Sequence, residues 1–412
     1  MKKYLLAATM LSFFVKGIAQ EQTQITPYPD SRTITTGVPF LLIASDARAA
    51  GMGDQGVATS PDAYSQQWNL SKYAFGESEQ GLALSYTPYL SELVNDIFLG
   101  NLTYYKKLDD RSAISASFRY FSLGEIEFRQ NANDLGIIEK PNELTLDVGY
   151  SLKLNDRFAM GVALRYLRSD LKLQNAGENI DAKAAGSFAV DVTGYYESEE
   201  KAYGSFNGKW RGGFALQNFG PKIKYDDAGQ ENFLPTTLRL GGGFDFILDE
   251  ANTIGVTVEA AKLLVPTPPV RGQKLVYQDA NGNGVYDGPS QANPSGETIV
   301  SQDDNYIIEG QDNNVNFMSG MFQSFGDAPG GFSEELREFT YALGAEYVYQ
   351  ENFAFRLGYF NEHETKGARK FFSLGAGFKY NVVNIDVSYL FSASKVPSPL
   401  ENTLRFSLGF DF

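Results

Sequence analysis

Apolar and polar residues alternate along most of the sequence from residue 80 to the end. The clearest stretch has apolar side chains at every second position, with Thr, Asp, Gly, Ser and Lys between them: Leu144, Leu146, Val148, Tyr150, Leu152 and Leu154. A period of two indicates β-strands with one apolar face. About fourteen such segments can be counted. They begin near residues 81, 97, 112, 142, 157, 186, 207, 236, 252, 337, 352, 370, 382 and 403.

Alternation of this kind fits two architectures. A soluble β-sandwich packs its apolar faces on an internal core, whereas a transmembrane barrel turns them toward lipid. Aromatic residues are abundant, with 24 Tyr and 31 Phe, and they gather near the strand ends as in interfacial girdles. The opposite faces carry Gly, Ser, Thr, Asn, Asp and Arg, which suit a polar lumen better than a solvated surface. Both features favour the barrel.

The connections between these segments alternate in length. Short connections cover residues 106–111, 155–157, 248–252, 350–352 and 381–382, and longer ones lie between them, at 123–141, 169–186, 219–235, 264–335, 361–369 and 392–402. Short periplasmic turns and long outer loops are the usual asymmetry of outer-membrane barrels. We therefore predict an all-β transmembrane fold, an antiparallel outer-membrane β-barrel of about 14 strands surrounded by lipid. With an even number of strands, we expect both termini in the periplasm.

The first residues have the pattern of a secretory signal peptide. Lys2 and Lys3 precede an apolar run over residues 4–15, and Gly17-Ile18-Ala19 supplies the small residues of a cleavage site. The run is too short for a membrane-spanning helix, which needs about 20 apolar residues. We predict that residues 1–19 are removed.

Residues 20–79 lack the alternation and are expected to form an N-terminal helical hatch, or plug, inside the lumen. Residues 45–50 suit a short helix with a Ser or Asp cap, and Gly51, Gly53 and Gly56 suit the turns that follow it. Residues 80–412 would then form the barrel, with a long extracellular loop at 264–334 that has no strands of its own.

Composition restricts the chemistry that this chain can perform. There are 0 Cys and 1 His, so thiol nucleophiles and His-rich metal sites are excluded and a Ser-His-Asp triad would depend on His363 alone. The formal net charge of −15 argues against nucleic acid as a partner. We predict no enzymatic activity. Charged residues on the lumen faces are expected to pair inside the barrel: Arg119, Asp147, Arg165, Arg239, Asp245 and Arg356.

One string of residues resembles a known protein family. In order it reads Ala47-Arg48-Ala49-Ala50-Gly51-Met52-Gly53, then Gly56-Val57-Ala58, then Asp62-Ala63 and Trp68-Asn69. The string is similar to the hatch of FadL-type outer-membrane proteins. Within that superfamily it resembles the PorV family of the type IX secretion system of Bacteroidota.

The resemblance implies a function in protein export. A PorV-like chain would be a non-enzymatic outer-membrane component that binds the large translocon barrel. It would receive secreted cargo through the C-terminal signal domain of the cargo and pass it to the attachment complex. The alternative is a FadL-like transporter of long-chain fatty acids or other hydrophobic small molecules, which would need an apolar pocket in the lumen.

The long loop at 264–334 contains a candidate calcium site. Residues 279–287 read DANGNGVYD, with oxygen ligands from Asp279, Asn281, Asn283 and Asp287, a carbonyl from Val285, and Gly at position 6. This is the spacing of an EF-hand loop. Position 12 is Ser290 instead of the usual Glu, so a remote carboxylate would have to complete the shell, with Glu297, Asp303 and Asp304 as candidates. The alternative is a flexible turn. Any Ca²⁺ would rigidify the loop, and the predicted function requires no cofactor.

The same loop carries an apolar cluster at near-helical spacing: Phe317, Met318, Met321, Phe322 and Phe325. These residues either fold the loop down as a lid over the barrel mouth or form an exposed docking surface for a partner, since large exposed apolar patches usually bind something. The sequence leaves both interpretations open.

Overall fold

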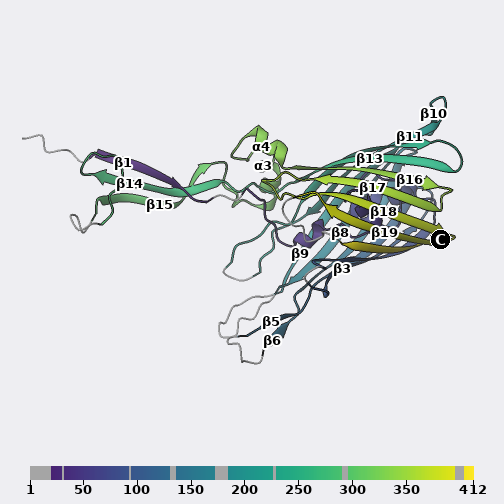
Figure 1. The fold of residues 1–412 in the computed structure, drawn as a ribbon, viewed down its shortest axis with the longest axis horizontal. Helices are drawn as coiled ribbons and strands as arrows, with labels where there is room; N and C mark the ends of the chain where they lie inside the picture. Colours follow the sequence, from purple (N-terminus) through teal and green to yellow (C-terminus); the bar gives the residue numbers. More distant parts are fainter. Residues whose placement is uncertain are drawn as a thin grey trace, which may run out of the picture.

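Fourteen strands form a closed antiparallel barrel in the computed structural model (Figure 1), which describes residues 20–29, 32–91, 94–129, 136–171, 184–225, 229–289, 296–394 and 403–412. The barrel strands are β2 (Gln80–Pro88), β3 (Ile97–Lys107), β4 (Ser112–Leu123), β7 (Asn142–Asn155), β8 (Phe158–Asp170), β9 (Ala185–Glu197), β11 (Asn207–Phe219), β12 (Thr237–Ile247), β13 (Asn252–Leu263), β16 (Phe339–Tyr349), β17 (Phe353–Asn361), β18 (Lys370–Tyr380), β19 (Val383–Ser392) and β20 (Leu404–Asp411). The predicted fold class is confirmed. The predicted signal peptide lies outside the described residues.

Two pairings close the barrel. β20 pairs with β2, with Phe406 opposite Tyr86, and β11 pairs with β9, with Ala215 opposite Thr193. A closed barrel leaves no strand edge, so every backbone group in the wall can be hydrogen-bonded inside the bilayer. In the described part of the chain, no helix is long and apolar enough to cross a membrane.

Each strand separates an apolar outer face from a polar inner face. In β8, the outward-pointing Leu164 is 55% exposed, whereas Arg165, the next residue, points into the lumen and is 2% exposed. The same alternation in neighbouring strands leaves a band of Leu, Val, Phe and Tyr around the outside of the barrel. This distribution of apolar and polar side chains is the reverse of that in a soluble protein, and it matches a barrel whose outer wall faces lipid.

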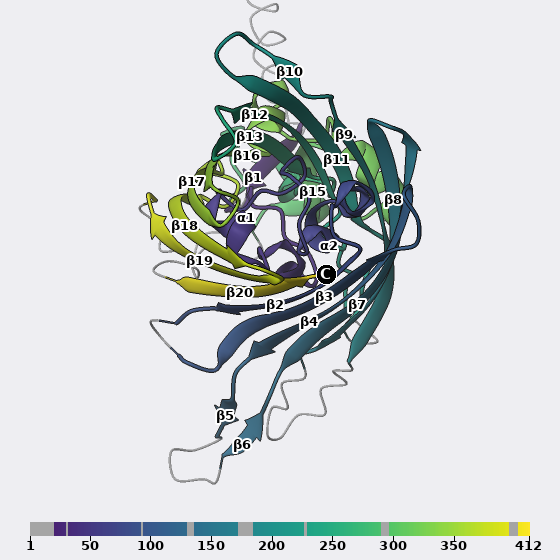
Figure 2. The ribbon, with the colours of Figure 1, turned by 90° about the vertical axis from the view of Figure 1, so that its right-hand side faces the viewer.

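The hatch fills the lumen with four short helices, seen inside the barrel in Figure 2. They are η1 (Pro39–Leu42), α1 (Ala47–Gly51), α2 (Ser65–Trp68) and η2 (Leu70–Phe75). Val38, Ala44, Ala47 and Trp68 are all buried. The hatch therefore serves as the core of the barrel.

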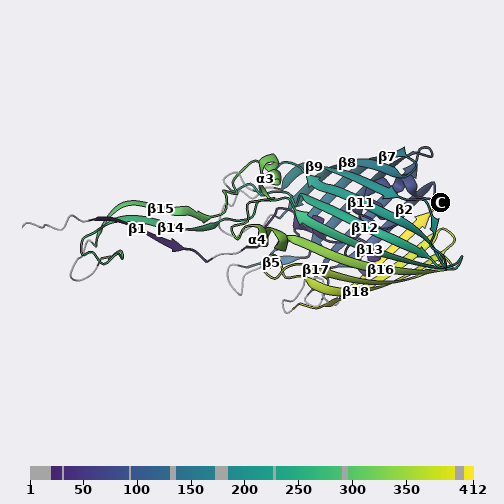
Figure 3. The same ribbon diagram turned by 90° about the horizontal axis from the view of Figure 1, so that it is seen from above.

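A narrow three-stranded sheet projects from one end of the barrel (Figures 1 and 3). We call it the extension; it contains β1 (Gln20–Pro27), β14 (Val270–Asp279) and β15 (Thr298–Glu309), in the order β1-β14-β15. Two predictions were wrong here. Residues 20–27 are a strand outside the barrel and no part of the hatch, and the long loop at 264–334 contains two strands. Both errors have one cause: β1 and the centre of β15 consist mainly of polar residues that are largely exposed, so they lack the alternation that marks strands.

The two ends of the described chain lie at opposite ends of the barrel. Gln20 is paired with Asp279 in the extension, and Phe412 lies at the other end, marked C in Figure 1. The expectation that both termini face the same side rested on the even strand count, which fixes only the two ends of the barrel wall, where Glu79 N donates to Phe412 O. It is not met by Gln20, because the residues that precede the barrel wall reach into the extension.

The remaining elements lie in the connections. A small hairpin, β5 (Ile126–Phe128) with β6 (Ile137–Glu139), extends the loop between β4 and β7, and β10 (Lys201–Ala202) pairs with the start of β11. Two helices, α3 (Phe317–Gln323) and α4 (Phe332–Arg337), lie between the extension and the barrel mouth (Figure 1).

Candidate functional site

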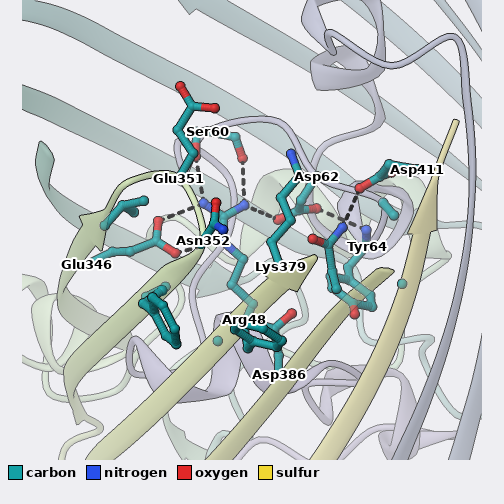
Figure 4. Close-up of a pocket in the computed structure, with 18 of the residues that line it drawn as sticks. Arg48, Ser60, Asp62, Tyr64, Glu346, Glu351, Asn352, Lys379, Asp386 and Asp411 are labelled. Carbon is teal, nitrogen blue, oxygen red and sulfur yellow. Dashed lines mark hydrogen bonds and ion pairs between the residues drawn. The ribbon is translucent and has the colours of Figure 1, made fainter. Parts of the chain in front are cut away.

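Arg48, on the hatch helix α1, is the centre of the contacts between hatch and wall (Figure 4). The helix begins where the Asp46 carboxylate accepts a hydrogen bond from Ala49 N at 2.8 Å. The Arg48 guanidinium then forms an ion pair with Asp62 of the hatch at 2.5 Å and with Glu346 of β16 at 2.7 Å. Arg48 therefore joins two parts of the hatch to each other and to the barrel.

The ion pairs continue along the wall from Glu346. Its carboxylate also binds Arg356 of β17 at 2.7 Å, and Arg356 reaches Asp386 of β19 at 2.6 Å. Asp62, Arg48, Glu346, Arg356 and Asp386 thus alternate in sign. Arg48, Arg356 and Asp386 are buried, and Asp62 and Glu346 are partly buried. Each charge lies beside an opposite one, which is the condition under which buried charge is tolerated.

The neighbouring strands β13 and β12 hold the hatch backbone directly. Glu259 of β13 accepts hydrogen bonds from Gly56 N at 2.9 Å and Val57 N at 3.0 Å. Arg239 of β12 pairs with the same carboxylate at 2.8 Å, and its guanidinium lies 5.2 Å from the ring centre of Trp68. These contacts fix the turn that follows α1.

The predicted pairing of lumen charges is confirmed for five of the six residues. Arg165 pairs with Asp147 at 2.6 Å and Asp245 pairs with Arg211 at 2.6 Å, and Arg239 and Arg356 are paired as described above. Arg119 is the exception, because it forms no ion pair among the described residues. Its guanidinium donates to Phe40 O at 3.1 Å and lies 5.5 Å from the Phe40 ring centre.

A second charged cluster closes the barrel mouth beside α4, and the sequence analysis missed it. Glu334, Glu335 and Glu338 point toward two lysines, so that Lys262 of β13 pairs with Glu335 at 3.1 Å and Lys366 pairs with Glu334 at 2.8 Å and with Glu338 at 2.9 Å. All five side chains are buried. The spacing of the glutamates places them on one side of a helix, a signal that the sequence contains.

Asp327 anchors the segment between the two outer helices. Its carboxylate accepts a hydrogen bond from Thr267 N at 3.0 Å. Burial raises the pKa of Asp327 to about 6, and the nearby carboxylates of Glu335 and Glu338 act in the same direction, against the lowering effect of the Thr267 hydrogen bond. Buried polar contacts, including the hydrogen bond between Thr267 N and Asp327, thus hold the connection that follows β13 at the barrel mouth.

The predicted apolar cluster is divided between two environments. Phe317 and Met321 are half-buried, and the Phe317 ring lies 5.4 Å from that of Phe219 on β11. Met318, Phe322 and Phe325 are exposed, with Phe322 68% exposed. One side of α3 therefore packs on the barrel, while the other side presents apolar side chains outward. Phe332 and Leu336 of α4 are also exposed and were not part of the predicted cluster.

The candidate calcium loop lies in the extension, directly after β14. The Asp279 carboxylate accepts backbone hydrogen bonds from Gly282 at 2.5 Å and from Gly284 at 2.8 Å; these hydrogen bonds, the one from Gly284 first, lower its pKa. Both glycines have positive φ. The Asn281 and Asn283 side-chain amides donate to Asp287 at 2.5 and 2.9 Å.

Of the three remote carboxylates, Glu297 lies at this loop. It accepts hydrogen bonds from Ala280 N at 2.9 Å and Asp287 N at 3.0 Å, whereas Asp303 and Asp304 lie farther along β15. Ser290 is outside the described residues. In the part of the chain that is described, no group of three or more His, Cys, Asp or Glu side chains is arranged to hold a metal ion.

Comparison with known proteins assigns the family. A model of the family described as "Type IX secretion system protein PorV" matches residues 26–270, more than half of the chain. The chain belongs to the PorV family. That membership, with the barrel fold, places it in the outer membrane and among the components of type IX secretion. A search of curated proteins finds no match.

Among solved structures, the PorV-family chain resembles hydrocarbon channels in fold. It matches a TodX deltaS2S3 mutant monoaromatic hydrocarbon channel with a TM-score of 0.50 and 11% identity, over 90% of this chain and 99% of that one. A Pseudomonas aeruginosa FadL homologue matches with a TM-score of 0.43 and 10% identity, over 93% and 100%. The Ralstonia pickettii toluene transporter TbuX has a TM-score of 0.42 and 11% identity, over 90% and 100%. At such identities the likeness concerns the fold alone.

Proposed function

We propose that this chain is a non-enzymatic component of the type IX secretion system. It binds the large translocon barrel and receives secreted cargo through the cargo's C-terminal signal domain, for transfer to the attachment complex. The observation that carries the proposal is the family match over residues 26–270. The lumen is compatible with this proposal, because the described hatch helices and ion-paired side chains fill it.

We infer the orientation from the connections. The short turns and Phe412 face the periplasm, and the extension and α3 face the cell exterior, as expected of barrels whose long loops are external. Residues 1–19 act as the signal peptide in this proposal. Cargo released outside the membrane would then meet the extension and the two outer helices first.

We propose the exposed side of α3 as the surface that contacts cargo. Met318 and Phe322 project from a helix whose other side is held by Phe219, and Phe325 is exposed just after the helix ends. Apolar side chains that point outward from a fixed helix suit a partner that buries them.

The test is a pull-down of the tagged full-length protein from native membranes. We expect recovery of a very large barrel together with secreted proteins that share a C-terminal domain. Phe322→Ser combined with Met318→Ser should reduce cargo recovery several-fold and leave recovery of the large barrel unchanged. Ile138→Ser is the matched control, since Ile138 is a similarly exposed apolar residue on the β5–β6 hairpin. Equal cargo recovery in all variants would remove α3 from the proposal.

A FadL-like transporter is the second candidate, favoured by apolar contacts inside the lumen that the sequence analysis did not place there. Phe40, Leu99, Phe121 and Leu167 form one buried cluster between hatch and wall. They are packed against one another, so a hydrophobic ligand would have to displace the hatch. Saturable binding of a labelled fatty acid to the purified protein, together with failure to recover any large barrel, would favour the transporter.

We also propose that the 279–287 loop binds Ca²⁺ and thereby rigidifies the tip of the extension. Support comes from the ligand spacing and from Glu297, a carboxylate that contacts the loop backbone at Ala280 and Asp287. Titration of the full-length protein with Ca²⁺ should show one saturable site, weakened at least tenfold by Asp279→Ala. Asp304→Ala is the control, because Asp304 bonds Gln273 away from the loop. Equal weak binding by all three proteins would eliminate the site.

A further inference from the structure

A depression lies at the end of the barrel that carries Phe412, on both sides of hatch residues 60–62. It consists of two cavities of about 240 and 270 Å³ that share Ser60, Pro61, Asp62, Lys379 and Asp411 among their lining residues. Figure 4 shows the side chains that line the first cavity, among them Asp62, Lys379 and Asp411. We call the two cavities together the Asp411 pocket.

The charges around the Asp411 pocket do not balance. In the first cavity, Arg48 and Arg356 are paired with three carboxylates, those of Asp62, Glu346 and Asp386. Asp411 lines both cavities and has no Lys or Arg within ion-pair distance among the described residues. It accepts hydrogen bonds from the Tyr105 hydroxyl at 3.2 Å and from Asn384 Nδ2 at 2.6 Å.

Two further acids line the pocket without an ion pair in the described structure. Glu351 lines the first cavity and Glu77 the second. Lys379 is the lining cation that is likewise unpaired, so three unpaired carboxylates share the pocket with one unpaired ammonium group. A concave surface with an excess of one sign concentrates ions of the other sign.

Tyr64 gives an independent indication of a missing partner. The side chain lines the first cavity and is 3% exposed, and its hydroxyl has no hydrogen-bond partner in the described residues. A buried hydroxyl without a partner is costly. An N–H donor entering the cavity would supply a partner for the hydroxyl oxygen as well as for the free carboxylates.

We propose that the Asp411 pocket receives the charged side chain of a Lys- or Arg-bearing segment of a partner protein. Asp411 and Glu351, on opposite sides of the first cavity (Figure 4), supply carboxylates for the basic side chains, and the Tyr64 hydroxyl accepts one of their N–H groups. The two cavities beside the 60–62 ridge suit an extended segment with more than one basic residue. That this partner lies in the periplasm rests on the proposed function, which sets the orientation of the barrel. The charge and the lining residues of the pocket do not depend on that orientation.

The experiment titrates the full-length protein in detergent with a tri-lysine peptide. We expect saturable binding that weakens as salt increases and is absent with a tri-glutamate peptide. Asp411→Asn combined with Glu351→Gln should weaken tri-lysine binding at least tenfold, and Tyr64→Phe several-fold. Glu250→Gln is the control, because Glu250 is an exposed acid in the β12–β13 turn, outside the pocket. The affinity of this variant for tri-lysine should equal that of the unchanged protein.

Three outcomes would overturn the inference. Tri-lysine binding that is unaffected by the pocket variants would place the interaction elsewhere, and spermidine binding as tight as tri-lysine would show that a polypeptide is not needed. If Asp411→Asn fails to fold, Glu351→Gln with Glu77→Gln tests the same charge excess, and unchanged affinity there would likewise contradict it. Because the translocon pull-down is measured on native membranes and this titration on purified protein, failure of one is distinguishable from failure of the other.

Discussion

Glycines let the hatch backbone touch the barrel wall. A Cβ atom added at Gly358 of β17 would lie 2.1 Å from Gly53 N, and one added at Gly344 of β16 would lie 2.7 Å from Met52 O. Gly53 has a φ of +84°, which residues with a side chain rarely adopt, and its N–H donates to Ser373 Oγ at 3.0 Å. The hatch can therefore pack this closely against the wall only because these positions are glycine.

Gly358→Ala should destabilise the protein by about 1–3 kcal/mol, the usual cost of overpacking a filled interior. The added methyl group has no room unless the hatch backbone moves. The measurement is the midpoint of thermal unfolding in detergent. Gly242→Ala on β12 is the control, since the nearest atom to its Cβ would be 4.0 Å away. Equal midpoints for the two variants would contradict the close approach.

At the scale of single elements, α4 depends on lysines from other parts of the chain. Lys366→Ala removes one of the two cations that pair with each of Glu334 and Glu338, and leaves Arg32 and Lys262 as their other partners. We expect a cost below the roughly 3–5 kcal/mol of a buried charge left without any partner. We expect faster proteolysis within residues 317–337 and an intact barrel. Lys370→Ala is the matched control, because its ion pair with Glu364 is exposed and such pairs contribute about 0–1 kcal/mol. Equal cleavage rates would mean that the buried pairs do not hold α4.

The sequence predicts the barrel strands well and the extension not at all. Every barrel strand begins within two residues of its predicted start, because lipid on one side and a polar lumen on the other impose a strict period of two. β15 has polar residues on both faces, SQDDN at its centre, since both faces meet water. Its position depends on pairing with β14, which is a long-range contact that no local pattern encodes.

The hatch and its pairs were predicted in part, for a similar reason. The helix cap at Asp46 and the turn glycines are local features, so they could be read directly. That Arg48 pairs with Glu346, almost 300 positions later, follows from the register of β16 against the hatch and could not. Arg119 was wrongly expected in an ion pair because its position on the lumen face does not reveal that Phe40 lies opposite.

At the scale of the whole molecule, the N-terminal segment connects the extension to the hatch. β1 ends at Pro27 in the extension, and Val38 is already buried within the barrel. The same stretch is held at the mouth, where Arg32 pairs with Glu334 at 2.5 Å. The N-terminal segment is therefore attached to the extension, to the mouth and to the hatch within a short stretch of sequence.

Two apolar residues with similar exposed fractions lie in different surroundings in this architecture. Leu357, mid-way along β17, is 60% exposed and Val285, in the extension, is 55% exposed, yet the first must face lipid and the second water. Leu357→Arg should therefore destabilise the barrel in phosphatidylcholine bilayers by about 2–4 kcal/mol, the cost of Arg near the bilayer midplane. Val285→Arg should change stability by less than about 0.5 kcal/mol, as surface substitutions usually do. Urea unfolding of both variants in the same bilayers measures the difference. If the two substitutions cost the same, the outer face of β17 does not meet lipid, because water on both sides would treat the two arginines alike.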